Sequence, residues 1–294
     1  IVISAFEIVA LDLAGMSLYD AVTHTFACMA CGGFSTYNAG IEAFHSPLIE
    51  FILTFFMFAA GANFALYYRA IFIDKNFLLK DEEFRTYTFI LLGFAGLLTL
   101  VLYKDMEFSL FNSFRYAIFQ ITSIMTATGF ASTDFNQWTD SAKVLVFAVM
   151  FIGGCAGSTG GGPKVVRFLL VLKYARRELF KVIHPRLIKP IKFNNKAVPD
   201  DVLQSILSFI VIYILVFIFS AMLLTLLGVD MVSSATASIA TLGNIGPGFN
   251  VVGPMANFAS LPPLGKIILI NNMWVGRLEV YTVLVLFTSD FWHS

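Results

Sequence analysis

Charged residues are scarce in this sequence. Asp, Glu, Lys and Arg make up 13% of its 294 residues, whereas about a quarter of an ordinary globular chain is charged. Hydrophobic residues reach 58%, and 32 residues are Phe. A water-soluble domain of this size has too much surface to cover with so few polar side chains. The shortage of charge therefore argues against a soluble protein and indicates a chain that lies in lipid.

Cysteine and histidine are also few, with three and four residues. Cys28 and Cys31 are three apart in an apolar segment, but no second Cys pair or His cluster completes a metal or redox site, so we expect small buried residues there. A net charge of zero gives no sign of a nucleic-acid partner. The apolar stretches hold no catalytic triad, HExxH motif or paired carboxylates, so we expect neither an enzyme nor a cofactor.

Long apolar stretches dominate the sequence, and several reach the length of about 20 residues that crosses a hydrocarbon core. They cover residues 47–68, 86–103, 202–228 and 264–288, while 144–152 leads into a glycine cluster. The sequence starts without Met inside the apolar run 1–14, which resembles the end of a cut helix. We therefore expect it to be a piece of a longer chain.

Basic residues indicate the orientation. Ten of the 19 Lys and Arg lie in residues 164–196, and four more lie in residues 69–85. The positive-inside rule therefore predicts that loops 69–85 and 164–196 are cytoplasmic in a multi-pass protein of the cell inner (plasma) membrane. Either a docking surface for a cytosolic partner or a simple solvated face explains the larger basic loop equally well.

Three moderately apolar segments are too short to cross a bilayer and have the length of re-entrant helices. They cover residues 17–30, 111–125 and 231–241, and each ends at a glycine-bearing turn. Aligning the turns on glycine places equivalent small and large apolar residues before each one. The order helix, short helix, glycine turn, helix therefore occurs three times.

The anchors of this repeat are Gly33, Gly129 and Gly246. We divide the chain accordingly into residues 1–79, an incomplete pore unit, residues 80–196, a unit with a glycine-rich intramembrane loop, and residues 197–294, a further unit.

The repeated turns predict a specific chemistry. Irregular backbone survives at membrane depth only where it is buried in protein or lines a water-filled path. A short helix that ends in an extended glycine turn presents carbonyl oxygens that can replace the hydration shell of K⁺. Its negative dipole end also favours a cation, and glycine permits the torsions that the turn needs. The alternative is three turns that merely pack helices together.

A second glycine-rich run covers Gly153–Gly162, in which six of ten residues are glycine. Glycine costs about 1 kcal/mol in a helix interior, so we expect an unwound, mobile loop. A packing patch of small residues is the alternative. A phosphate-binding loop is excluded because Val165 follows Lys164 where Ser or Thr is needed. The predicted gate residues here are Gly153, Gly154, Gly157, Ser158, Thr159, Gly160, Gly161 and Gly162.

Arg277 is a basic residue deep inside the last apolar stretch. A charge within the membrane is costly and by default marks a function. We expect Arg277 to project below the glycine turns, contact the glycine-rich run and form a barrier to K⁺. The alternative is a salt bridge that joins two helices.

Several motifs carry a family resemblance. They are GGFST at 32–36, TATGF at 126–130, GNIGPG at 243–248, GGCAGSTGGGPK at 153–164, HPRLIKPIK at 184–192 and GRLEVYTVLVLFTSDFW at 276–292. In their order along the chain, these motifs resemble those of the Trk/Ktr/HKT potassium transporter superfamily, and within it those of the TrkH-type subunit. The resemblance implies an all-α integral membrane protein with repeated helix–re-entrant pore helix–filter loop–helix units, pseudo-fourfold around a central pore, of which the first unit is absent here.

The same resemblance implies a homodimer, a cytosolic TrkA-type nucleotide-binding regulatory subunit and K⁺ as the transported ion. It implies that K⁺ binds at residues of three filter loops. These residues are Cys31, Gly32, Gly33, Thr126, Ala127, Thr128, Gly129, Gly243, Asn244, Ile245 and Gly246. Potassium transport through this filter, gated by the intramembrane loop and Arg277, is the function we expect. A non-conducting pseudo-pore with a structural or regulatory role is the alternative.

Overall fold

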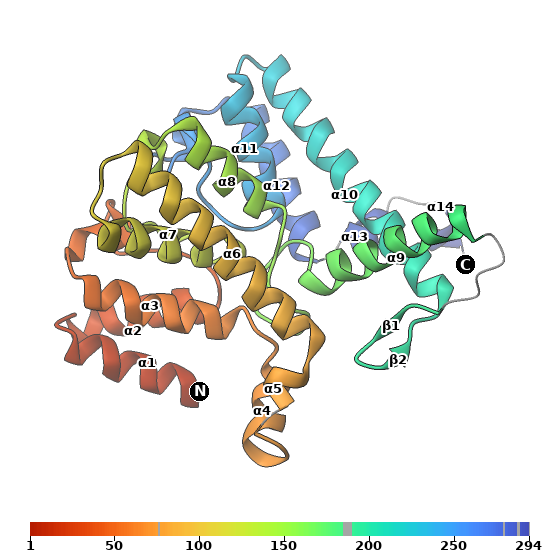
Figure 1. The fold of residues 1–294 in the computed structure, drawn as a ribbon. Coiled ribbons are helices and arrows are strands. Elements are labelled where there is room, and N and C mark those ends of the chain that lie inside the picture. Colours follow the sequence, from red (N-terminus) through yellow and green to blue (C-terminus); the bar gives the residue numbers. More distant parts are fainter. Residues whose placement is uncertain (76, 185–189, 279, 287–288, 294) are drawn as a thin grey trace.

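The computed structural model describes residues 1–75, 77–184, 190–278, 280–286 and 289–293. Helices account for nearly all of its regular structure (Figure 1). The prediction of a helical architecture is confirmed, apart from one small β-hairpin.

The three predicted repeats each contain a short helix between two others. The first repeat has α1 (Val2–Leu13), α2 (Leu18–Met29) and α3 (Pro47–Ala60); the second has α6 (Glu82–Asp105), α7 (Leu110–Met125) and α8 (Asp140–Met150); the third has α10 (Asp200–Leu226), α11 (Met231–Leu242) and α12 (Pro263–Arg277). We call α2, α7 and α11 the pore helices. Their bounds agree closely with the three short segments expected from the sequence.

Each pore helix starts at a capping side chain. Ser17, Ser109 and Asp230 accept hydrogen bonds from the backbone N–H three residues later, in α2, α7 and α11 respectively. Such caps satisfy a donor that the first turn of a helix leaves unpaired. They fix where the helix begins, and hence how far into the membrane its other end reaches.

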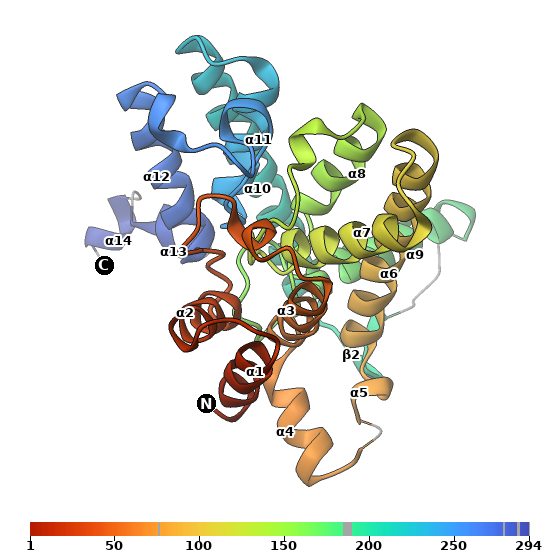
Figure 2. The ribbon, with the colours of Figure 1, turned by 90° about the vertical axis from the view of Figure 1, so that its left-hand side faces the viewer.

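The repeats pack around the pore helices in one recurring pattern. The helix before each pore helix contacts it, as does the helix after it. In addition, α3 contacts α7, and α8 contacts α11, so the last helix of one repeat lies against the pore helix of the next. Figure 2 shows α3 next to α7, and α8 near α11. The largest apolar core runs through α6, α7, α8, α10 and α11.

Two helices in the described part of the chain are long and apolar enough to cross a membrane by themselves, α6 and α10. The predicted crossing over residues 47–68 is not one straight helix. It breaks into α3 and α4 (Phe64–Phe72), which are bent by 91°. At the bend, a side chain on Gly61 would meet Thr126 and the Tyr87 hydroxyl, and Asn63 caps the start of α4. We call residues 61–63 the elbow.

The predicted crossing over residues 264–288 is also interrupted. α12 ends at Arg277 and α13 (Val280–Val285) is a separate helix, followed by α14 (Ser289–His293); Thr288 lies outside the described residues. Arg277 therefore occupies a helix C-terminus and not the middle of a helix. A cation is favoured at that end because the helix dipole is negative there.

The remaining α-helices and strands before α10 lie at the end of the molecule where α6 and α10 begin (Figure 1). They are α4, α5 (Phe77–Lys80), α9 (Val165–Ile183), and the antiparallel strands β1 (Lys192–Phe193) and β2 (Lys196–Ala197). Asn194 and Asn195 form the hairpin turn with positive φ, as a tight two-residue turn requires. The sequence reading did not anticipate this hairpin, and residues 185–189 of the predicted basic loop lie outside the described residues.

One buried ion pair joins the first two repeats and gives a test of the packing. Arg115 of α7 lies 3.2 Å from Glu50 of α3, with side chains 14% and 5% exposed. We expect Arg115→Ala to lower the free energy of unfolding of the full-length protein by roughly 3 kcal/mol, because it leaves a buried carboxylate uncompensated. Equilibrium unfolding in mixed micelles measures this effect.

The double variant Glu50→Leu/Arg115→Leu is the control. Removing both charges together avoids the unpaired carboxylate, so its stability should lie closer to wild type than that of Arg115→Ala. A single variant as stable as wild type would show that the pair does not hold α3 against α7.

Candidate functional site

The three pore helices end in the same backbone conformation. We call residues 30–33, 126–129 and 243–246 the glycine turns. In each turn the helix cap is right-handed, the next residue has a positive φ, and the anchor glycine has a positive φ as well. The positive values are 51° and 64° at Cys31 and Gly33, 57° and 86° at Ala127 and Gly129, and 53° and 112° at Asn244 and Gly246.

The same hydrogen bonds close each turn. The N–H groups of Cys31 and Gly32 donate to the carbonyls of Cys28 and Ala27 over 3.0 and 2.8 Å. The second and third pore helices repeat this pair of bonds at the equivalent positions. This is the Schellman arrangement, in which a left-handed residue lets the chain leave the helix while its last carbonyls stay bonded.

The carbonyls beyond these bonds remain available. Among the described residues, no hydrogen bond engages the carbonyl oxygens of Gly32, Thr128 or Ile245. These oxygens follow the C-terminal end of a pore helix, where the dipole is negative. Each turn therefore offers a cation both free oxygens and a favourable potential.

The anchor glycines place the turns directly against one another. A Cβ atom on Gly33 would collide with the Thr128 carbonyl, and one on Gly129 would collide with the Ile245 carbonyl. The Cβ position of Gly246 is open by comparison, with the Gly129 Cα 4.0 Å away. The predicted anchors thus lie together in sequence order, each turn against the next.

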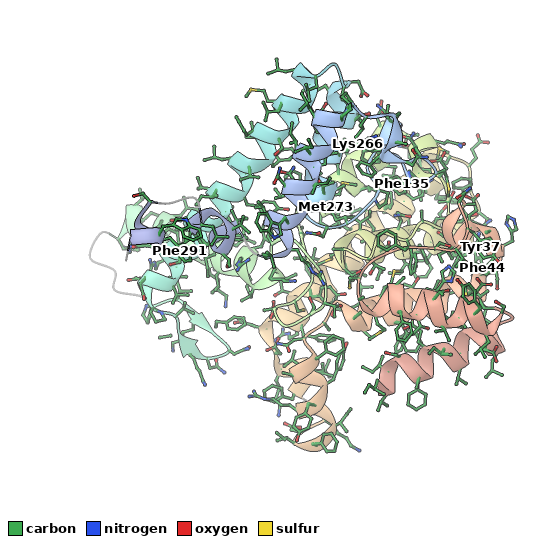
Figure 3. All side chains as sticks on the ribbon, turned by 180° about the vertical axis from the view of Figure 1, so that it is seen from behind. Tyr37, Phe44, Phe135, Lys266, Met273 and Phe291 are labelled. Carbon is green, nitrogen blue, oxygen red and sulfur yellow. The ribbon has the colours of Figure 1, made fainter. Side chains whose placement is uncertain are left out.

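Side chains behind the first turn hold the segment that leaves it. The Asp20 carboxylate accepts hydrogen bonds from the hydroxyls of Ser17, Thr36 and Tyr37 over 2.7, 2.9 and 3.2 Å. His24 Nε2 lies 2.9 Å from the Ser35 hydroxyl. The hydrogen bond from Ser17, and to a smaller extent those from Thr36 and Tyr37, hold the pKa of Asp20 below its usual value. Figure 3 shows Tyr37 beside Phe44. The two rings pack edge to face, with their centroids 5.1 Å apart.

The other two turns are supported by different residues of their pore helices. In the second, the Ser123 hydroxyl donates to the Phe130 carbonyl over 2.6 Å, and in the third, Thr236 Oγ1 accepts from the Phe249 N–H over 3.0 Å. Sequence reasoning did not pick out these supports. The signal was present, because buried Ser and Thr residues recur among the apolar residues of these two pore helices.

The predicted glycine-rich run forms a loop without helical structure. We call residues 151–164, between α8 and α9, the intramembrane loop. Its two ends pair with each other: the Gly153 N–H donates to the Pro163 carbonyl over 2.7 Å, and the Val165 N–H donates to Gly154 over 3.0 Å. The sequence expectation of an unwound segment agrees with this structure.

The first half of the loop lies against the elbow. The Cys155 N–H donates to the Gly61 carbonyl over 2.8 Å, and the Phe64 N–H donates to the Gly157 carbonyl over 3.4 Å. A Cβ on Gly154 or Gly157 would press on the elbow. Of the predicted gate residues, Gly153, Gly154, Gly157 and Ser158 therefore belong to the anchoring part of the loop.

The second half of the loop reaches all three glycine turns. Thr159 Oγ1 lies 3.0 Å from Cys31 Sγ in the first turn. A Cβ on Gly160 would come within 2.5 Å of the Thr126 carbonyl, and one on Gly161 within 2.5 Å of the Gly243 carbonyl. Gly162 also faces Gly243. Thr159, Gly160, Gly161 and Gly162 therefore fill the space at the helix ends, where larger residues would not fit.

Two positively charged side chains donate hydrogen bonds to this second half. Arg277 Nη1 donates to the Thr159 carbonyl over 2.9 Å, so the residue contacts the loop as the sequence predicted. Lys164 Nζ donates to the Gly160 carbonyl. Lys164 is also the first residue of the basic loop 164–196, so it lies where that loop meets the intramembrane loop.

Comparison with known proteins places this geometry in a family. A family model described as TrkH, cation transport protein, matches residues 2–294. The Trk system potassium uptake protein TrkH of Salmonella typhimurium is 41% identical over 288 residues, which are 97% of this chain and 59% of that protein. The Trk system potassium uptake protein TrkG of Escherichia coli is 33% identical over 290 residues, 98% of this chain and 59% of that protein.

A solved structure shows the same fold. The crystal structure of the potassium transporter TrkH from Vibrio parahaemolyticus matches with a TM-score of 0.93 and 38% sequence identity, covering 99% of this chain and 62% of that one. The chain thus spans about three fifths of the length of these relatives. The helical membrane fold and the family resemblance predicted from the motifs are both confirmed, and the family is one of transport proteins and not of enzymes. The chain belongs to the TrkH family of cation transport proteins.

Proposed function

We propose that the full-length protein conducts K⁺ across the membrane through a filter built from the glycine turns. The observation that carries this proposal is that the turns lie each against the next with unbonded carbonyl oxygens. Such oxygens can replace the water around a dehydrated K⁺ ion. The relatives named above are potassium uptake proteins, which supports K⁺ as the ion.

The proposed ion ligands are those expected from the sequence. They are the backbone carbonyls of Cys31, Gly32, Gly33, Thr126, Ala127, Thr128, Gly129, Gly243, Asn244, Ile245 and Gly246. The units 1–79, 80–196 and 197–294 each supply one turn. A pseudo-fourfold ring needs one turn more than the three that the described residues contain, so the experiments below use the full-length protein.

The proposed gate is the second half of the intramembrane loop together with Arg277. The loop lies against the ends of all three pore helices, and Arg277 bonds to its Thr159 carbonyl. A cation leaving the turns on that side would meet both the loop and a guanidinium charge. Displacing the loop would therefore open the path.

The proposed setting is the inner (plasma) membrane, with loops 69–85 and 164–196 in the cytoplasm. Basic residues concentrate in these loops, as the positive-inside rule requires. The proposed partners are a second copy of the chain and a cytosolic TrkA-type nucleotide-binding subunit, as the family resemblance implies. The relatives named above are proteins of a Trk system, which supports the presence of partner subunits. The lipid bilayer contacts the exposed apolar faces, of which α10 has the most extensive.

Ion flux through the full-length protein tests transport itself. Proteoliposomes that contain the full-length protein and are loaded with K⁺ should take up ⁸⁶Rb⁺ down its gradient, and external K⁺ should compete while Na⁺ should not. Uptake no faster than in empty liposomes would favour the non-conducting pseudo-pore. Uptake that Na⁺ inhibits as well as K⁺ does would contradict K⁺ selectivity.

The second prediction tests the contact between turns. Gly129→Ala should abolish ⁸⁶Rb⁺ uptake or its preference over Na⁺, because a Cβ there collides with the Ile245 carbonyl and the residue has a φ of 86°. Gly93→Ala is the matched control: Gly93 lies in α6, a Cβ on it would meet no atom within 4 Å, and Ala favours a helix. Equal uptake by both variants would argue against the filter.

The third prediction tests the gate. Arg277→Ala should raise ⁸⁶Rb⁺ flux several-fold, because it removes both a bond to the loop and a positive charge on the path. Lys266→Ala is the control, since Lys266 lies near the other end of α12 and bonds to the Ala259 carbonyl (Figure 3). Flux unchanged in Arg277→Ala, or raised equally in both variants, would remove Arg277 from the gate.

A further inference from the structure

A buried carboxylate holds both ends of the intramembrane loop. Glu83, in the first turn of α6, is 4% exposed. Its Oε1 atom accepts hydrogen bonds from the N–H groups of Ala156 and Val166 over 2.7 and 3.2 Å. Ala156 lies in the first half of the loop, and Val166 comes two residues after its end. One oxygen atom thus accepts hydrogen bonds from both segments that connect the loop to its neighbouring helices.

The bond to Val166 also gives a partner to an N–H group in the first turn of α9. Val166 is in the first turn of α9, whose own cap residue, Lys164, makes no side-chain capping bond. The N–H groups of a first turn have no partner within the helix, and the dipole there favours a negative charge. Glu83 supplies both the acceptor and the charge from a different helix. A buried carboxylate is costly unless it is hydrogen-bonded, so the loop and Glu83 stabilise each other.

The hairpin fixes the end of α6 that carries Glu83. Asn194, in the hairpin turn, donates through Nδ2 to Asp81 over 2.7 Å and through its N–H to Glu82 over 3.1 Å. Its Oδ1 atom accepts the Glu82 N–H over 2.9 Å. Asp81 is the cap of α6, so the hairpin bonds to the two residues that directly precede Glu83. The hairpin is therefore connected to the loop through the three consecutive residues 81–83 at the start of α6.

We propose that Glu83 is a positioning residue that holds the intramembrane loop against the glycine turns, and that Asn194 fixes the helix end from which Glu83 acts. This inference rests on the proposed gate but concerns the opposite side of the loop. Arg277 bonds to the half that faces the turns, whereas Glu83 bonds to the attachment points. Release of Glu83 frees the loop at its base, and the loop then moves away from the turns.

Cys155 gives a readout of loop position that does not depend on transport. Its thiol is free, wholly buried, and adjacent to Ala156. In purified full-length protein, the rate at which a methanethiosulfonate reagent modifies Cys155 is measured by peptide mapping. Glu83→Ala should raise this rate about tenfold or more, because each lost bond to a charged acceptor is worth at least about that factor. Asn194→Ala should raise it less, in the same direction.

Two controls separate loop release from general loosening. Cys28 is also free and wholly buried, in α2 far from Glu83 in the chain, so its labelling should stay at the wild-type rate. Glu178→Ala removes a carboxylate of α9 that bonds only to Arg177 and Lys181 in the described structure, and should leave Cys155 protected. A parallel rise at Cys28 and Cys155 would overturn the proposal, since it would mean that the whole fold has loosened.

Conservative replacement and flux complete the test. Glu83→Gln keeps an oxygen acceptor without the charge, and neutral hydrogen bonds are about half as strong, so its labelling rate should lie between wild type and Glu83→Ala. If Glu83→Ala does not yield monodisperse protein, Glu83→Gln decides. Labelling of Cys155 at the wild-type rate in the decisive variant overturns the proposal, whatever the flux. Faster labelling of Cys155 in Glu83→Ala, together with unsubstituted protein that carries no ⁸⁶Rb⁺, supports the positioning role and rejects the transport proposal.

Discussion

The structure depends on one constraint: peptide groups that leave a helix at membrane depth must find hydrogen-bond partners within the protein. The chain leaves helical geometry in the glycine turns, the elbow and the intramembrane loop. These segments satisfy much of their need from one another. The loop bonds to the elbow through Cys155 and to itself through Gly153, while the turns bond back to their pore helices. The irregular backbone of all three segments thus lies together at the C-terminal ends of the pore helices.

What remains unbonded at that place is informative. The carbonyls of Gly32, Thr128 and Ile245 accept no hydrogen bond in the described structure. Two of the positive-φ positions next to them are occupied by Cys31 and Ala127, residues that adopt this conformation at a cost. A protein retains such strain where the surrounding structure enforces it, and here that structure is the helix end and its supporting side chains.

The site brings negative helix ends and positively charged side chains close together. The pore helices direct their negative ends toward the turns, which favours a cation there. Next to the turns, the side chains of Arg277 and Lys164 donate to carbonyls in the second half of the loop and bring positive charge there. Glu83 balances this charge at the base of the loop. Attraction at the turns and repulsion next to them are the two features that a gated cation path requires.

The sequence predicted the parts of this site that depend on local pattern. The pore helices followed from apolar runs too short to cross a membrane, and the turns followed from glycine at a fixed offset from them. The elbow at Gly61 was missed because a single glycine in an apolar run reads as continuous helix, and the end of α12 at Arg277 was missed for a similar reason. Glu83 was missed because its partners are backbone N–H groups 73 and 83 residues away, which carry no sequence signal.

We propose that the glycine turns surround a dehydrated cation. Crystals of the full-length protein grown in Tl⁺, a K⁺ mimic with strong anomalous scattering, test it most directly. We expect anomalous peaks among the turns, coordinated by the carbonyl oxygens of residues such as Gly32, Thr128 and Ile245. Anomalous peaks confined to other parts of the protein, with none among these carbonyls, would contradict it.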